Sequence, residues 1–80
     1  MTTRTITTAT ANHAALAFAI DMLQEWYRIA SVSTEDATRM ECFMKVISWR
    51  GQVGKLMNTV PAESRAYRRA TEVLDATTSI

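Results

Sequence analysis

The chain has very few of the residues that form cross-links or catalytic sites in small proteins. Its 80 residues include one cysteine, Cys42, and one histidine, His13. A single thiol cannot form an intramolecular disulfide, and one Cys with one His cannot complete a tetrahedral metal site. Nucleophilic catalysis needs a base beside the attacking Ser or Cys, and nothing in the sequence brings His13 to Cys42. We therefore expect no enzymatic activity, no cofactor and no metal, and the lone thiol favours a reducing compartment, the cytoplasm.

Glycine and proline are scarce as well, with two residues and one residue respectively. Residues 50–55 read RGQVGK, but a phosphate-binding loop needs Ser or Thr after the lysine, and Leu56 stands there. Long apolar runs are also missing: no segment approaches the roughly 18–20 apolar residues that span a bilayer, so we expect no membrane insertion. A chain this short makes one domain and buries only about 60–65% of its unfolded surface, so a second copy or another partner should stabilise it.

What the sequence does contain is an apolar pattern of helical period. It predicts an all-α protein, a small three-helix bundle with antiparallel neighbours that self-associates. Six of residues 2–10 are threonine, a β-branched type that disfavours helix, so we expect residues 1–11 to form a disordered tail. Residues 12–76 then form a single helical domain, and residues 77–80 form a frayed C-terminal tail.

Local signals place the ends of the three helices. The first is predicted over residues 13–30. The second should begin after Ser33, which forms an approximate capping box with Asp36. The third should begin at Pro61, because proline suits the first helical turn, and should end near residues 75–76. The inner stripe of the first helix is predicted to consist of Leu16, Ile20, Leu23 and Tyr27.

The second helix carries a long apolar line. Met40, Met44 and Ile47 recur at intervals of four and three residues and are predicted to form its inner stripe. Gly51 and Gly54 continue this line, although a glycine in a helix interior costs about 1 kcal/mol relative to alanine. We favour a helix that continues through a glycine notch facing another helix; the alternative is a hinge at Gly51. The residues predicted to mediate helix packing or self-association are Trp26, Tyr27, Met40, Met44, Trp49, Gly51 and Gly54.

Charge is distributed unevenly along the chain. Residues 39–69 hold seven basic and two acidic side chains, a net charge of +5, whereas residues 1–38 and 70–80 each sum to −2. A cationic middle between acidic ends can attract an anionic partner or the acidic end of a second copy. Arginine suits this role because its planar fork pairs with carboxylates and phosphates. The predicted partner-binding residues are Arg65, Arg68, Arg69, Tyr67, Arg50, Lys55 and Lys45.

These patterns predict a non-enzymatic interaction protein that binds a macromolecular partner through a basic helical face and the adjacent apolar surface. An inhibitor, an adaptor or a small regulatory subunit would fit, and the size is typical of host–virus inhibitors. The preferred partner is a protein with an acidic surface. One alternative is a nucleic-acid-binding helical module, although its acidic ends would oppose phosphates. A second alternative is a homo-oligomer that captures an anionic small ligand between the arginine faces of its copies.

Overall fold

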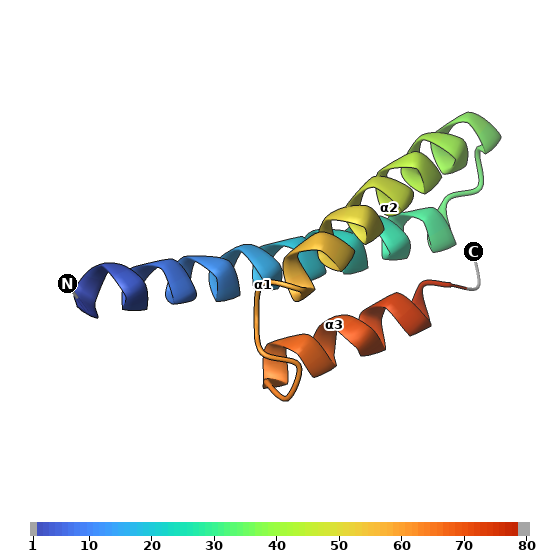
Figure 1. Cartoon of the computed structure of the whole chain (residues 1–80). Coiled ribbons are helices and arrows are strands. Elements are labelled where there is room, and N and C mark those ends of the chain that lie inside the picture. Colours follow the sequence, from blue (N-terminus) through green and yellow to red (C-terminus); the bar gives the residue numbers. More distant parts are fainter. Residues whose placement is uncertain (1, 79–80) are drawn as a thin grey trace.

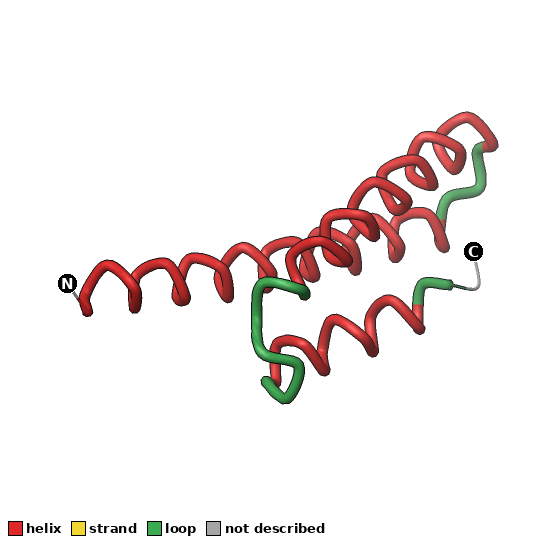
Figure 2. Tube along the Cα trace, viewed as in Figure 1, coloured by secondary structure: helices red, strands yellow, loops and turns green. Residues whose placement is uncertain are grey.

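Helices are the only regular secondary structure in the described part of the chain. A computed structural model describes the backbone of residues 2–78 and the side chains of residues 11–78. Within this range the helices are α1 (Thr2–Val32), α2 (Asp36–Met57) and α3 (Arg65–Ala76), and there is no strand (Figures 1 and 2). The predicted all-α three-helix bundle is therefore confirmed. Figure 1 shows α2 running back along the C-terminal half of α1, with α3 packed against the pair.

Helix α1 begins earlier than the sequence pattern predicts. It starts at Thr2 rather than near residue 13, so residues 2–11, expected to be a disordered tail, continue the helix. No glycine or proline interrupts residues 2–32, which removes the strongest local reason for the helix to stop. Figure 1 shows the N-terminal turns of α1 extending past the ends of α2 and α3, and the molecule measures 52 × 20 × 15 Å.

The junction between α1 and α2 differs from the predicted capping box. The Ser33 hydroxyl donates a hydrogen bond to the Ile29 carbonyl at 2.7 Å, so this side chain closes α1 instead of opening α2. Glu35 is the N-cap of α2, and its side chain makes no capping hydrogen bond within the described residues. The backbone is extended at Glu35, so the helix begins directly after it. The negative charge of Asp36 in the first turn interacts favourably with the helix dipole. The capping-box prediction is wrong.

Helix α3 begins after Pro61 and not at it. The N-cap is Ser64, whose hydroxyl oxygen accepts a hydrogen bond from the Tyr67 amide at 3.1 Å. This bond satisfies one of the unpaired N–H groups of the first turn, an advantage that a start at Pro61 would lack. The predicted end is confirmed at Ala76. Thr77, predicted to begin the frayed tail, is buried at 4% exposure, and residues 79–80 of that tail lie outside the described residues.

The core lies where the three helices meet. Leu16, Ile20 and Leu23 are fully buried, which confirms the predicted inner stripe of α1. Trp26, Tyr27 and Trp49 are half-buried and pack against this core, as expected of aromatic anchors. The buried residues of the core cluster are Leu16, Ala19, Ile20, Leu23, Val46, Val53, Val60, Ala70 and Val73.

The predicted inner stripe of α2 lies on the wrong side of the helix. Met40, Met44 and Ile47 are exposed at 64%, 66% and 67%, whereas the buried residues of α2 are Cys42, Val46 and Val53. α2 is apolar on both sides, so its sequence pattern alone does not choose between them. The buried side also carries Trp49 and Leu56, two large apolar side chains that pack against the core. Met40 and Met44 therefore have no packing role between the helices of one chain.

The two glycines do not interrupt α2. The helix runs from Asp36 to Met57 without a break, which confirms the continuous form over the hinge. A Cβ atom built at Gly51 or Gly54 would have no neighbour within 4 Å in the described part of the chain. The glycine notch is therefore open, and no helix of the same chain occupies it.

Candidate functional site

Three arginines gather on the outer side of α3. Arg65, Arg68 and Arg69 stand at i, i+3 and i+4, a spacing that places them together on one side of a helix. With Glu72, one turn further, they line a shallow surface pocket of about 270 Å³. All four side chains are exposed, and the other side of α3 buries Ala70 and Val73 in the core cluster. We call Arg65, Arg68 and Arg69 the arginine face.

One member of the arginine face is tied to α1. Arg69 Nη2 donates to Asp21 Oδ1 at 3.1 Å, and both side chains are solvent-exposed. A surface pair of this kind contributes roughly 0.2–1 kcal/mol to stability, so its main effect is to orient Arg69. Arg65 and Arg68 make no ion pair with any residue that the structure describes. Their guanidinium groups are the ones available to a carboxylate or phosphate from outside.

Tyr67 does not belong to the arginine face, although the sequence pattern grouped it there. It is half-buried and packs against the core cluster. Two residues along a helix correspond to about 200°, so position 67 points away from positions 65 and 69. Tyr67 therefore helps to pack α3 onto the core, and its contact with a partner stays a prediction.

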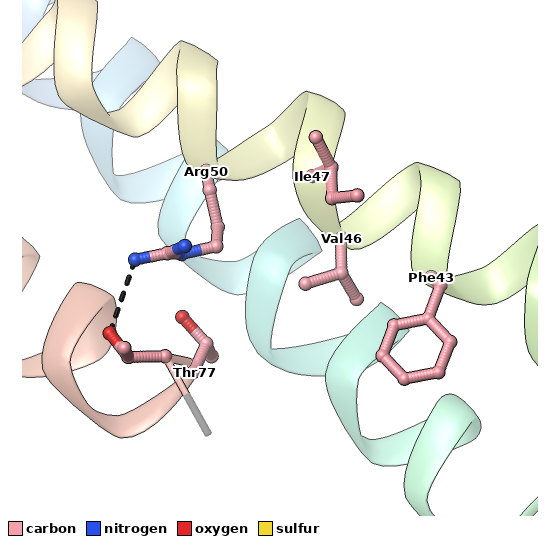
Figure 3. A pocket seen from close by; sticks show the side chains of 6 residues that line it. Phe43, Val46, Ile47, Arg50 and Thr77 are labelled. Carbon is pink, nitrogen blue, oxygen red and sulfur yellow. Dashed lines mark hydrogen bonds between the residues drawn. The ribbon is translucent and has the colours of Figure 1, made fainter. Parts of the chain in front are cut away.

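Arg50 also serves the fold. Its Nη2 donates to the Leu74 carbonyl and to the Thr78 hydroxyl, both at 3.2 Å, and the second bond is the dashed line in Figure 3. Through these bonds Arg50 joins the last turn of α3, where the Leu74 carbonyl also accepts a hydrogen bond from the Thr78 hydroxyl at 2.7 Å. Its Nε is buried and has no hydrogen-bond partner among the described residues. The small pocket beside it, about 120 Å³, is lined by Phe43, Val46, Ile47, Arg50, Thr77 and Thr78 (Figure 3).

The two predicted lysines of α2 lie apart from Arg50 and from each other. Lys45 places its Nζ 5.9 Å from the centre of the Trp26 ring, a cation–π contact with α1. Lys45, Arg50 and Lys55 follow one another at five-residue steps, about 140° around the helix, so they face three directions. The basic middle of the sequence therefore does not form one surface. Among the described side chains, several cations come together on the arginine face of α3.

His13, Cys42 and the acidic side chains are the possible metal ligands among the described residues. Among them, no three His, Cys, Asp or Glu side chains come close enough to hold a metal ion. Cys42 is buried on the inner side of α2, and His13 is exposed on α1. No helix in the described range is long and apolar enough to cross a membrane.

Three comparisons with known proteins found no match to this chain. No protein-family model matches this chain, and neither a curated protein nor a solved structure matches it significantly.

Two structural features were missed by sequence reasoning, and only one had a local signal. Arg50 stands between Val46 and Val53 at helical intervals of four and three residues, so its position beside the buried side of α2 was readable. The Asp21–Arg69 pair joins residues 48 positions apart and had no signal in the sequence.

Proposed function

We propose that this chain is a non-catalytic interaction protein whose arginine face binds an acidic surface of another protein. The observation that carries the proposal is the gathering of three exposed arginines around one shallow pocket of about 270 Å³ on α3. Arginine forks form paired hydrogen bonds with carboxylates, which give both affinity and a defined orientation. A protein that acts by covering a surface needs no catalytic group, and this fits an inhibitor, an adaptor or a small regulatory subunit of the cytoplasm.

Two acidic side chains favour a protein partner over nucleic acid. Glu72 lines the same pocket as the arginines, and Asp21 is paired with Arg69. Three cations and two anions leave the site with a local charge of +1, arranged as a pattern of both signs. A site with both signs selects a partner with complementary charges, whereas each acidic side chain in the site opposes a phosphate backbone.

The proposal is tested with a pair of charge-reversed variants. The chain is immobilised, its partner is captured from lysate and identified, and the affinity is then measured with the purified partner. Arg65→Glu with Arg68→Glu should weaken binding at least a hundredfold and leave helicity unchanged, because both side chains are exposed. Arg69 is left in place so that its pair with Asp21 survives.

A matched control makes the same change in net charge elsewhere. Arg28→Glu with Arg39→Glu reverses two exposed residues outside the predicted partner-binding set and should reduce affinity only a few-fold, through the long-range field. Equal losses for the two pairs, or no loss for the α3 pair, would refute a role for the arginine face. The affinity is then measured as a function of salt concentration. A slope of about −0.9 in log affinity against log salt for each phosphate contact would show that the arginine face binds nucleic acid, and would reject the protein partner.

A further inference from the structure

The exposed side of α2 has the pattern of a helix–helix seam. Met40, Met44, Ile47, Gly51 and Gly54 follow one another at steps of four, three, four and three residues. This is the repeat by which two helices pack along each other in a coiled coil. The first three are among the large apolar residues most exposed on the molecule, and the two glycines are open to solvent or half-buried. We call these five residues the outer stripe.

The order of large and small residues along the outer stripe makes it complementary to itself. The methionines occupy the N-terminal half, the glycines occupy the C-terminal half, and Ile47 lies at the centre. If a second copy of α2 lies antiparallel across a two-fold axis at Ile47, Met40 faces Gly54 of the second copy. In the same register Met44 lies within one residue of Gly51 of the second copy, about 1.5 Å along the helix axis. Each long methionine side chain then fills the space that a missing side chain leaves, as close packing requires.

The charges beside the outer stripe match the same arrangement. Glu41, Ser48 and Lys55 recur every seven residues along one edge of the stripe, and all are exposed. In the antiparallel register Glu41 lies beside Lys55 of the second copy, and the reciprocal pair forms at the other end. A parallel arrangement would set methionine against methionine and glycine against glycine, and would leave gaps at the glycine end.

We propose that α2 mediates an antiparallel homodimer of this chain through the outer stripe. The occupant of the stripe is a second copy, because both the sizes and the charges of the stripe are matched by the stripe itself. The seam is about 21 Å long, from 14 residue steps of 1.5 Å each. It involves a single helix of each copy, so we expect a small interface and a dimer that dissociates on dilution. The arginine face lies on α3 and stays exposed, so a dimer would present two such faces to a partner.

The dimer is tested by sedimentation equilibrium of the full chain from low to several hundred micromolar. The wild-type chain should shift from monomer to dimer. Ile47→Arg, which brings two like charges together on the axis, should raise the dissociation constant at least tenfold. Gln52→Arg adds the same charge on a different side of α2 and should leave it within about twofold. Both positions are exposed, so circular dichroism should show unchanged helicity. A wild-type chain that stays monomeric at every concentration, or an Ile47→Arg variant that dimerises normally, overturns the proposal.

The orientation is tested by exchanging charges. Glu41→Lys and Lys55→Glu should each weaken the dimer several-fold, and the double exchange should restore it, because the antiparallel pairs reform with reversed signs. A double variant that is weaker than either single one rules the antiparallel register out.

Cysteine cross-linking gives a second measure of the orientation. Ile47→Cys should form a disulfide-linked dimer, since the two copies of this position meet on the axis. Met40→Cys should not link to itself, because its two copies stand about 21 Å apart, yet it should link to Gly54→Cys in a mixture. Native Cys42 is buried and supplies the background. Efficient self-linking at position 40 would show a parallel pair and refute the proposal.

Discussion

The two glycines of α2 should affect the isolated chain and the dimer in opposite directions. Gly51 and Gly54 lie inside a continuous helix, and neither has a positive φ that would require glycine. Each costs about 1 kcal/mol relative to alanine in a helix interior. A Cβ at either position would meet no atom within 4 Å of the described chain, so alanine adds no steric conflict within one copy. Replacing both by alanine should therefore stabilise the monomer by about 2 kcal/mol.

The expected change is large enough to measure by thermal unfolding. For a domain of this size, 1 kcal/mol shifts the Tm by about 4–8 °C, so the double alanine variant should melt about 8–16 °C higher in dilute solution. In the dimer the added methyl groups would meet Met40 and Met44 of the second copy. Overpacking of this kind costs about 1–3 kcal/mol, which corresponds to a roughly 5- to 150-fold weaker association.

The assay compares melting curves at low and high protein concentration with sedimentation of the same samples. The wild-type Tm should rise with concentration, whereas the Tm of the double variant should start higher and rise less. Gln52→Ala, an exposed substitution of nearly neutral helix propensity on another side of α2, is the control and should change neither quantity appreciably. A lower Tm in dilute solution would refute the open glycine notch. A higher Tm with unchanged association would refute the seam.

Three further predictions concern the monomer. Leu23→Ala should destabilise the fold by about 2–5 kcal/mol in urea unfolding, because the side chain is fully buried; a loss below about 1 kcal/mol would mean that the core can collapse around it. Arg50→Met should lower the free energy of unfolding by about 1–2 kcal/mol, because it removes the hydrogen bonds to the end of α3. Arg68→Met should change the same quantity by no more than about 0.5 kcal/mol. Equal effects of the two substitutions would contradict the capping role of Arg50. Amide hydrogens of residues 2–11 should exchange far faster than those of residues 16–30, because this part of α1 extends past the other helices, and equal protection would show that it is held.

The sequence by itself determined the features that depend on neighbouring residues. The three helices follow from apolar spacing, and the breaks near Ser33 and Pro61 follow from residues that interrupt or cap helices. The arginine face is equally local, because residues at i, i+3 and i+4 meet on any helix, whatever surrounds it. Its existence could be read from three positions, 65, 68 and 69, without knowing how α3 packs.

Only the tertiary structure decided which side of each helix became the inside. α2 has apolar residues on two sides, and the line of Met40, Met44 and Ile47 was as plausible a core as the line of Val46 and Val53. Because the side of α2 with Val46 and Val53 faces the core, the Arg50 side chain reaches the Leu74 carbonyl at the end of α3. A helix with two apolar sides has no inner side until other helices cover one of them. The side that is covered depends on the apolar area buried by all three helices together, a quantity that no single segment contains.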